Sequence, residues 1–375
     1  MYICEICGKE FENLEDLEIL NGYYICNECN EDEYVCCGDC NSLVKQEDAY
    51  YIDGDYYCDE CTICCYCCEE IARVSNCYCY HNNYSICESC YDECYFTCDR
   101  CGEIERYEDG NRFDDNYYCE YCYNNVLEDC GIHNYGYKPC CNFLHEENEA
   151  TLRKNNLHIG IELEIQGSDL IGFCNEINSE YDFDDGNFYL KTDGSLLDNG
   201  VEIVSQPMTY KYITENKDWK FCYKQIHNYD MSDTSGCGLH FHLDREYLTG
   251  KDIKMIDYIV NTFSDFFETV GGRKYDYYCQ KRDKRIDDWG MATDSRYSAV
   301  NLNNSNTVEL RFCKSTYNYN TFIQRVKMIF AIVEFAKRYK NKFKDIINWH
   351  YDCFCEKFNK VYKEKFGVDI DFSLD

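Results

Sequence analysis

Eight C-x2-C pairs at regular intervals before residue 123 constrain the fold of this chain more than any other feature. Taken two pairs at a time, they are separated by spacers of 18, 17, 18 and 17 residues, so one unit is written four times. The four sets are Cys4, Cys7, Cys26 and Cys29; Cys37, Cys40, Cys58 and Cys61; Cys65, Cys68, Cys87 and Cys90; and Cys98, Cys101, Cys119 and Cys122. Four thiolates at this spacing are the ligands of a structural Zn²⁺ site, which predicts about four zinc ions per chain.

A short phrase before each second pair predicts a small β-hairpin. The phrases are NGYYICNEC, DGDYYCDEC, NNYSICESC and DNYYCEYC. Asn-Gly and Asp-Gly favour tight turns, and the tyrosines alternate as they do in a strand. Because units below about 40 residues cannot build a sufficient core, the metal is expected to provide most of the folding free energy. The spacing resembles zinc ribbons and the half-sites of LIM domains, although LIM sites often include a histidine.

A disulfide framework is the alternative explanation for so many cysteines. C-x2-C pairs are poor long-range disulfide partners, and the N-terminal MYICEICGKE has neither the basic nor the apolar stretch of a signal peptide, so zinc is favoured. A tetrathiolate site has no open coordination position, which predicts a binding or positioning role for this region. The cysteines outside the register, which the sequence does not assign, are Cys36, Cys64, Cys67, Cys77, Cys79, Cys94, Cys130, Cys140 and Cys141.

Negative charge is concentrated in the cysteine-rich half. Residues 1–150 hold 7 Lys and Arg against 35 Asp and Glu, a net of -28 out of a total of -33. This surface repels phosphate backbones, so no nucleic-acid partner is expected and a basic, amine-bearing or peptide partner fits better. No run of about 18 apolar residues occurs, which predicts a soluble, cytoplasmic protein without a membrane partner. Abundant Tyr, Asn, Lys and Ile with two prolines are typical of an AT-rich bacterial or phage genome.

Beyond residue 141 the pattern changes to longer strands that share an unusual polar face. In LHIGIELEIQG, residues 157–167, the isoleucines and Leu163 alternate with Gly160, Glu162 and Glu164, so two carboxylates lie on one face. The solvent-exposed face of an ordinary β-strand usually carries a mixture of Thr, Lys, Ser and Gln. Four later stretches show the same alternation: NGVEIVSQP with Glu202, GCGLHFHLDR with His240 and His242, RYSAVNLNN with Asn301 and Asn303, and NTVELRF with Glu309 and Arg311.

If these strands belong to one sheet, its polar face carries oxygen and imidazole ligands with an arginine among them, which suits a divalent metal and phosphate together. Several adjacent carboxylates are costly unless a metal neutralises them. Helical patterns over residues 251–270 and 320–343 are expected to cover the opposite face. The predicted fold class is α+β. The predicted domains are four tandem Cys4 zinc modules over 1–130, a lead-in over 131–157, and a sheet-based catalytic domain over 158–375.

The ordered set GIELE, DGSL with GVEIVSQP, GLHFH and NTVELRF resembles the amidoligase family, which are ATP-dependent carboxylate-amine ligases with a glutamine synthetase-like fold. The segment NYGYKPCCNF is similar to the stretch that often precedes the first strand of that family. The resemblance covers residues 135–345. It implies an antiparallel sheet with covering helices. It also implies a reaction in which ATP phosphorylates a carboxylate, and an amine attacks the acyl phosphate to give an amide, ADP and phosphate.

The resemblance also implies roles for individual residues. The ligands of two or more Mg²⁺ ions would be Glu162, Glu164, Glu202, His240 and Glu309, with His242 as a further ligand or a phosphate contact. The transferring phosphoryl group and the nucleotide would be contacted by Arg311, Arg296, Asn301 and Asn303. Asp193, in the DGS turn with Ser195, would bind metal or the incoming amine, and a turn-forming role is its alternative.

Other functions remain open at this point. The phrase HFHLDRE resembles a cupin motif with Glu246 as its acid, but the glycines of that fold are missing and Glu246 is expected to cap or start a helix. His240 and His242 could bind zinc as in a hydrolase, although no third histidine occurs in a comparable strand. Cys237 could be a nucleophile, but a small residue packed between glycines is favoured.

Three hypotheses follow: an active ligase whose zinc modules recruit a peptide or protein, an adaptor with an inactive ligase fold, and a metal-dependent hydrolase. No glutamate or arginine of the ligand set is visibly replaced, which favours the active ligase. The sequence does not name the carboxylate or the amine substrate.

Overall fold

The computed structural model describes residues 1–29, 33–81, 83–147, 153–180, 186–194, 196, 199–233, 236–283, 286–293 and 295–372. The chain divides into two compact units. Unit 1 comprises Met1–Arg112 and Asn116–Tyr123, and unit 2 comprises Phe113–Asp115 and Asn124–Asp375. Among the described residues, no helix combines the length and the apolarity that a membrane span requires.

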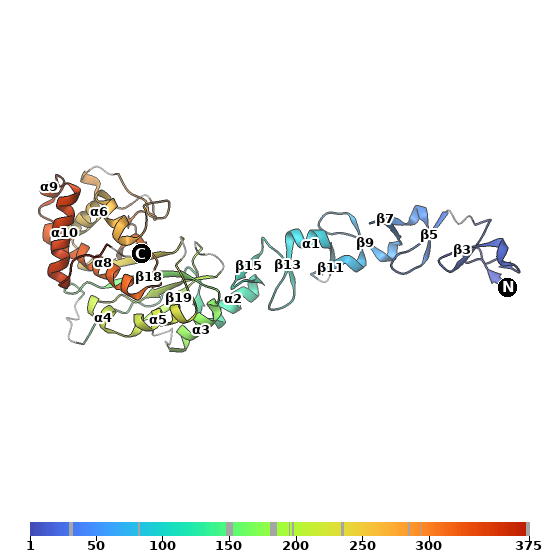
Figure 1. The fold of residues 1–375 in the computed structure, drawn as a ribbon, viewed down its shortest axis with the longest axis horizontal. Helices are drawn as coiled ribbons and strands as arrows, with labels where there is room; N and C mark the ends of the chain where they lie inside the picture. The colour runs from blue at the N-terminus through green and yellow to red at the C-terminus, as the bar shows by residue number, and fades with distance from the viewer. Residues whose placement is uncertain are drawn as a thin grey trace. The chain divides into compact units, whose positions relative to one another are not determined.

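Unit 1 is a series of short antiparallel hairpins, two for each set of four cysteines, where the sequence predicts one (Figure 1). In each set, the first hairpin encloses the first cysteine pair and the second hairpin leads into the second pair. The first hairpins are β1 (Tyr2–Ile3) with β2 (Glu10–Phe11), β5 (Tyr34–Cys36) with β6 (Leu43–Lys45), β9 (Thr62–Cys64) with β10 (Ile71–Arg73), and β13 (Tyr95–Thr97) with β14 (Ile104–Arg106).

The second hairpins are β3 (Leu17–Leu20) with β4 (Tyr23–Cys26), β7 (Tyr50–Ile52) with β8 (Asp55–Tyr57), β11 (Cys77–Tyr80) with β12 (Tyr84–Cys87), and β15 (Gly110–Phe113) with β16 (Asn116–Cys119). Single 3-10 turns lie at Leu14–Asp16, Gln46–Asp48, Asp59–Cys61 and Val74–Asn76. Two helices follow second hairpins: α1 (Glu88–Cys94) after β12, and α2 (Glu120–Asp129) after β16. The boundary between the two units falls within α2.

The first hairpin of every set turns in the same way. The residue after the second cysteine of the first pair has a positive φ: 71° at Gly8, 60° at Asn41, 62° at Glu69 and 76° at Gly102. Its N–H donates to the carbonyl of the first cysteine, as Gly8 N does to Cys4 O at 2.8 Å. The backbone therefore repeats with the sequence, although only two of these positions carry the glycine that a left-handed conformation favours.

The buried clusters described in unit 1 are small, and each includes one or two of the cysteines. Around Cys4 and Cys26 the buried cluster includes only Leu17 in addition, with Tyr2 and Phe11 partly buried against it. Cores this small contribute little free energy of folding, as expected for units of this length.

Unit 2 is built on a seven-stranded sheet with helices, which agrees with the predicted mixture of a large sheet and helices. The order of strands is β17-β19-β20-β18-β21-β23-β22. All neighbouring pairs are antiparallel except β17 and β19. The strands are β17 (Ile132–His133), β18 (Ile159–Gln166), β19 (Phe188–Lys191), β20 (Gly200–Ser205), β21 (Gly238–Asp244), β22 (Val300–Asn301) and β23 (Thr307–Lys314).

Strand β17 belongs to the segment that the sequence assigns to the lead-in. It pairs with β19 as an edge strand, with Ile132 opposite Leu190. Two residues give too short a pattern for a strand to be predicted from periodicity. The sheet therefore begins earlier in the chain than residue 158.

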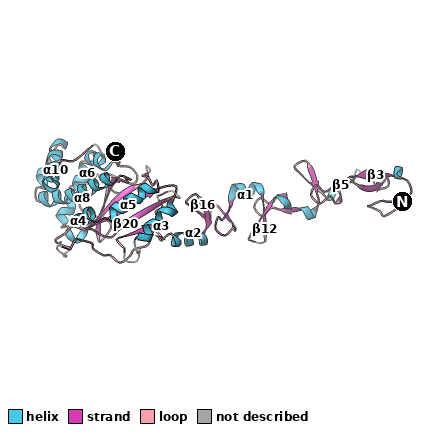
Figure 2. Cartoon of the chain, turned by 60° about the horizontal axis from the view of Figure 1, so that its bottom comes forward, coloured by secondary structure: helices cyan, strands magenta, loops and turns pink. Residues whose placement is uncertain are grey.

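Helices pack on the apolar face of this sheet (Figure 2). The rings of Phe267 and Phe312 lie 5.1 Å apart, and those of Trp219 and Phe188 lie 4.8 Å apart. The predicted helix over 251–270 is divided in two at Phe263, whose backbone leaves the helical region with φ -103° and ψ 42°. The helices are α3 (Leu170–Glu180), α4 (Tyr210–Glu215), α5 (Asp218–Asn228), α6 (Gly250–Thr262), α7 (Ser264–Gly271), α8 (Tyr319–Tyr339), α9 (Phe343–Ile346) and α10 (Tyr351–Phe366), with 3-10 turns at Arg245–Tyr247 and Ile286–Asp288.

Candidate functional site

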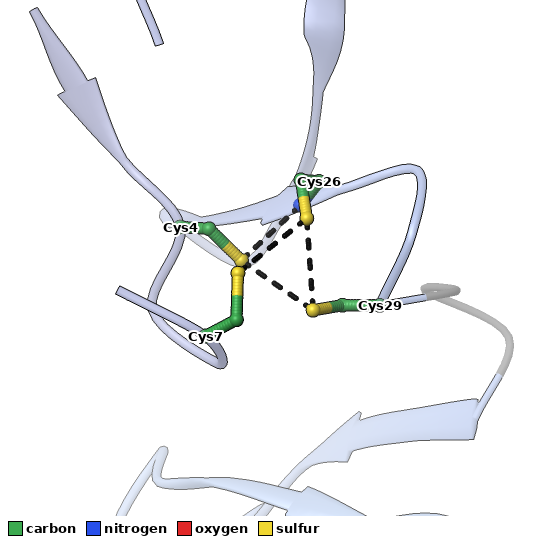
Figure 3. Close-up of side chains that lie close together, drawn as sticks. All are labelled: Cys4, Cys7, Cys26 and Cys29. Atoms are coloured by element: carbon green, nitrogen blue, oxygen red, sulfur yellow. Dashed lines mark hydrogen bonds between the residues drawn. The ribbon is translucent and has the colours of Figure 1, made fainter. Parts of the chain in front are cut away.

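Each set of four predicted zinc ligands converges on one point. In the first set, the Sγ atoms of Cys4 and Cys29 lie 3.8 Å apart, those of Cys7 and Cys26 3.7 Å, and those of Cys26 and Cys29 3.6 Å (Figure 3). A tetrahedron with Zn–S bonds of about 2.3 Å has S···S edges of about 3.8 Å. The thiolate positions therefore match a tetrahedral zinc site without rearrangement.

The other three sets converge in the same way, with all four sulfur atoms of each within 4.8 Å of one another. The sixteen cysteines of the register carry no disulfide bonds. These four groups are compatible with structural zinc sites, and the disulfide framework that the sequence left as an alternative is not observed. Among the cysteines outside the register, Cys64 donates to the carbonyl of Glu69 at 3.3 Å.

In each set, the pKa values of the first and the last thiol shift in opposite directions. Against the effect of burial, the N–H groups of Cys7 and Cys26 lower the pKa of Cys4 to about 6. Burial and the neighbouring thiols raise the pKa of Cys29 to about 12. The first and last cysteines of the other sets shift in the same directions. The fourth thiol resists ionisation because it would add charge beside other thiolates, and a divalent cation at the centre would remove that penalty.

In unit 2 the polar face of the sheet brings together side chains that are distant in the sequence. Glu164 of β18 lies opposite Glu202 of β20, and Glu162 lies opposite His240 of β21. His240 Nδ1 is 3.6 Å from Glu162 Oε2 and 3.7 Å from Glu164 Oε1. One imidazole therefore lies between the two carboxylates of β18.

A second group forms around the other carboxylate oxygen of Glu162. His242 Nε2 lies 3.1 Å from Glu162 Oε1, and His242 is opposite Glu309 of β23. One ligand atom from each of these three residues lies within 4.8 Å of the others. Asn301 of β22 donates to Glu309 Oε2 at 2.8 Å and so orients that carboxylate. Glu162 therefore belongs to both groups. Together with Glu202, which lies opposite Glu164, the two groups form what we call the carboxylate cluster: Glu162, Glu164, Glu202, His240, His242 and Glu309.

A glycine at the start of β21 allows its backbone to reach the cluster. Gly238 N–H donates to Glu164 Oε2 at 2.6 Å. A Cβ at Gly238 would lie 2.4 Å from His240 Nε2, so a side chain there would displace the imidazole. The adjacent Cys237 is 1% exposed, a packed position rather than that of a nucleophile open to substrate.

The pKa values of the carboxylates in the cluster shift in different directions. Burial would raise the pKa of Glu162, but His242 and His240 lower it well below its ordinary value. Burial and the charge of Glu162 raise the pKa of Glu202 well above its ordinary value, and burial raises that of Glu164. Against the effect of burial, the charge of Glu162 raises the pKa of His242 to about 9. Not all of these acids ionise easily together in the absence of a cation.

The donors of the cluster fit a divalent cation. Carboxylate oxygens are the ligands that Mg²⁺ prefers, and imidazole extends the choice to transition metals. Within the described part of the chain, the buried Glu202 Oε2 and His242 Nε2 have no aligned hydrogen bond. The charge that raises the pKa of Glu202 would be compensated by a bound cation.

Two cations flank the acids, and the sequence motifs indicated only one of them. Arg311 Nη1 lies 2.5 Å from Glu309 Oε1. Lys191, at the end of β19, lies opposite Glu202 with Nζ 3.4 Å from Glu202 Oε2. The alternation in FYLK, residues 188–191, is a signal for this strand, but four residues give too short a pattern for a confident strand prediction.

Arg296 lies at the margin of the site rather than among the acids. Its side chain is exposed and donates to the hydroxyl of Tyr135 at 3.2 Å. Lys191 Nζ lies 5.2 Å from the centre of the Tyr135 ring. Arg296 is therefore connected to the cluster through a tyrosine of the lead-in.

The remaining predicted residues differ in position. Asp193 follows β19, and its negative charge contributes to the raised pKa values of Glu164 and Glu202. Asn303 is exposed, and its Oδ1 accepts a hydrogen bond from Thr293 N at 2.8 Å, so the contact observed for Asn303 stabilises a loop. Ser195 lies outside the described residues.

Comparison with known proteins leaves the family of the chain open. No protein-family model matches the chain, and no curated protein matches it. A cryo-EM structure of glutamine synthetase from Plasmodium falciparum matches with a TM-score of 0.35 and 11% identity, over 71% of this chain and 61% of that chain. The chain thus spans less than two thirds of that neighbour. A likeness of this extent decides neither the fold family nor the function, and membership of the amidoligase family stays a prediction.

Proposed function

We propose that unit 2 is an ATP-dependent carboxylate-amine ligase of the amidoligase type, with a glutamine synthetase-like fold. The observation that carries this proposal is the carboxylate cluster, in which four glutamates and two histidines lie on one face of the sheet beside Lys191 and Arg311. Acids this dense are costly for folding alone. They provide what phosphoryl transfer requires, which is positioning and charge neutralisation rather than a protein nucleophile.

Two groups of residues would hold Mg²⁺ ions. Glu162, His242 and Glu309 form one group, and Glu162, Glu164 and His240 form the other. When bound, such ions neutralise phosphate oxygens and orient the nucleotide. Because Glu162 belongs to both groups, its carboxylate sets their separation.

Arg311 and Lys191 would stabilise the phosphoryl group during transfer. The planar guanidinium of Arg311 suits phosphate oxygens, and it is held by Glu309 on one side and the carbonyl of Tyr278, 3.4 Å from its Nε, on the other. Lys191 is buried beside Glu202, so its charge acts in a weakly screened environment. Arg296 with Tyr135 would contact the nucleotide at the margin of the site.

The proposed reaction balances in two steps. A carboxylate oxygen of the substrate attacks the γ-phosphorus of ATP, the bond from that phosphorus to the β,γ-bridging oxygen breaks, and ADP leaves. The amine nitrogen then attacks the acyl carbon and releases phosphate, which keeps one oxygen of the original carboxylate. An ammonium substrate gives up two protons in all, of which phosphate retains one at neutral pH.

The zinc modules of unit 1 would recruit a peptide or protein partner. Closed tetrathiolate sites have no open position for chemistry, so their contribution is a fixed surface. Residues 1–150 carry a net charge of -28, and each tetrathiolate centre would add about two further negative charges. A basic peptide fits this surface better than a nucleic acid.

The test is whether ATP turnover depends on an acceptor. Full-length protein is incubated with Mg-ATP and a pooled extract of small carboxylates, with and without a pool of amines, and both ADP and new amide masses are measured. The ligase forms ADP and an amide only when both pools are present. Hydrolysis of amides without ATP would instead assign the metal-dependent hydrolase, which the group of Glu162, His242 and Glu309 also suits. Absence of turnover and of nucleotide binding would assign an adaptor.

A further inference from the structure

A cavity of about 270 Å³ lies on the polar face of the sheet, beside the carboxylate cluster. Its floor comes from three adjacent strands, where Gly160 is opposite His242, and Asp244 is opposite Thr307. Phe143 and Arg153 of the lead-in contribute to its walls. The cavity is small for a ligand pocket, which suits a group the size of an amino-acid side chain better than a nucleoside triphosphate.

His242 connects this cavity to the proposed reaction site. Its side chain lines the cavity, and its Nε2 lies 3.1 Å from Glu162 Oε1. The hydroxyl of Thr307, also part of the lining, is 3.4 Å from His242 Nδ1. A ligand in the cavity would therefore contact His242 and lie one side chain away from Glu162.

A glycine in the middle of a strand keeps the floor of this cavity open. Glycine weakens the interior of a strand, and it often marks a place where a ligand approaches the backbone closely. A Cβ at Gly160 would lie 3.5 Å from the Cβ of His242, which is ordinary contact, so no steric demand of the protein itself requires glycine here. The space above Gly160 is therefore available to a ligand.

The charges around the cavity favour a cation. Arg153 lines the wall, but all three of its guanidinium nitrogens are engaged by acids. Its Nε lies 2.9 Å from Asp244 Oδ2, its Nη2 bonds Asp244 Oδ1, and its Nη1 lies 3.1 Å from Glu246 Oε2. The positive charge of Arg153 thus meets two negative charges, and the pair of His242 with Glu162 adds one charge of each sign. A carboxylate ligand would find this cation already neutralised, whereas an ammonium group would complete the charge balance.

We propose that this cavity binds the amine substrate of the ligase, as a primary ammonium group on a short aliphatic chain. This inference rests on the proposed function, because an amine has a role here only if the neighbouring cluster activates a carboxylate. Phe143, with the Arg153 guanidinium 4.0 Å above its ring, provides an apolar wall for the aliphatic part. The attraction for the ammonium group comes from Asp244 in the lining and from Glu246, which lies outside the lining against Arg153.

Three probes of equal length and different charge test the site: n-butylammonium, n-butyrate and n-butanol. Each is titrated into zinc-loaded full-length protein without nucleotide, with binding measured by calorimetry and by ligand-observed NMR. We expect n-butylammonium to bind at least fivefold more tightly than either other probe. Glu246→Gln should weaken its binding about fivefold, because the excess negative charge beside the cavity is removed while the pair of Arg153 and Asp244 remains.

Gly160→Val places a branched side chain on the floor of the cavity and should strongly weaken binding of n-butylammonium. Gly250→Val is the matched control, since nothing lies within 4 Å of a Cβ at Gly250 and the cavity lining does not include it. Equal binding of the three probes, preference for n-butyrate, or binding that survives both Gly160→Val and Glu246→Gln would overturn the proposal. If Gly160→Val does not fold, Glu246→Gln alone decides.

Failure of this proposal is distinguishable from failure of the proposed function. Binding of n-butylammonium requires no ATP, and stabilisation by Mg-ATP requires no amine. Nucleotide stabilisation without selective amine binding would leave the ligase in place and remove this cavity as the amine site. Selective amine binding in a protein that never binds Mg-ATP would leave an amine-binding site without the proposed reaction.

Discussion

The two units place charged ligand groups together by different means. In unit 1 the four predicted ligands of each set come from a stretch of about 26 residues, and one or two of them belong to a small buried cluster in each of the first three sets. In unit 2 the proposed ligands come from strands between Glu162 and Glu309, and the opposite face of those strands is a fully buried apolar core. The metal would therefore be part of the folding free energy in unit 1 and an addition to a folded sheet in unit 2.

Removal of zinc should give the largest effect, and it should separate the two units. Purified protein is expected to contain about four zinc ions per chain, and a strong chelator under reducing conditions should unfold unit 1 alone. Hydrogen exchange would show amides of residues 1–112 losing protection while those of β18 and β21 keep theirs. A zinc content near one, or loss of protection in β18, would contradict this difference between the units.

Substitution of the shared carboxylate should have the next largest effect. Glu162→Gln keeps the size of the side chain and removes a ligand from both proposed metal groups, so nucleotide turnover should fall about a thousandfold or more. The stabilisation that Mg-ATP gives to the native state should be lost in a thermal-shift assay. Glu147→Gln is a control at an exposed acid of the lead-in. Equal responses to Mg-ATP in the parent and in Glu162→Gln would mean that this carboxylate holds no metal.

The position of the unit boundary can be sharpened by truncation. A protein that starts at residue 124 keeps the second half of α2, with the buried Val126 and Leu127, and the edge strand β17. A protein that starts at residue 135 loses all of these, and burial of two such side chains contributes roughly 3–6 kcal/mol. We expect the first truncation to fold without zinc and the second to be less stable by at least that amount in urea denaturation. Equal stability would place the boundary where the sequence alone puts it.

Without metal, Glu202→Gln and Glu162→Gln should give smaller changes in melting temperature, and the two changes should have opposite signs. The pKa of Glu202 is raised well above its ordinary value by burial and by Glu162, so its ionisation costs stability as the pH rises above that ordinary value. Glu202→Gln should raise the melting temperature in EDTA at neutral pH by a few degrees. The pKa of Glu162 is lowered by its histidines, so Glu162→Gln should lower that melting temperature. Shifts of the same sign would show that His242 and His240 do not favour the charged form of Glu162.

The sequence predicted more of the residue grouping in unit 1 than in unit 2, for a physical reason. Thiolate ligands that are close in sequence are close in space, so spacing alone identified all four sets. The first hairpin of each set was missed because strands such as β1, with two residues, have no period. The turn at Gly8 closes the loop that holds the first cysteine pair, with Gly8 N donating to the carbonyl of Cys4.

In unit 2 alternation predicted that the proposed ligands share one face, which the sheet register shows, but it could not give strand order. The polar faces of β18, β20, β21 and β23 were visible because each strand is long enough to alternate. Lys191, the cavity above Gly160 and the contact of Arg296 with Tyr135 depend on which strands are neighbours, and that is decided by packing of the whole sheet. His240 lies between Glu162 and Glu164 and so reduces the repulsion expected between these two carboxylates. This contact also depends on which strands are neighbours.

The smallest expected effect concerns coupling between the repeats of unit 1. Arg73 of the third set forms an ion pair with Asp39 of the second, and its guanidinium lies 4.6 Å from the centre of the Tyr57 ring. Exposed ion pairs of this kind contribute little to stability. Arg73→Met should therefore change the zinc affinity of either neighbouring set by less than about threefold, measured by competition with a chromophoric chelator. Arg100→Met provides a control at an arginine of the fourth set.

The shape of the chelator titration curve shows whether each set of unit 1 folds independently around its own metal. If each set folds around its own metal, the four zinc ions should leave in independent steps, and Arg73→Met should leave those steps unchanged. Repeat arrays with strong interfaces behave differently, because the loss of one unit removes its neighbours as well. Cooperative loss of two ions in the parent that becomes stepwise in Arg73→Met would show that unit 1 is a coupled array. Its stability would then come from interfaces, as that of the sheet does, and not from the metal sites alone.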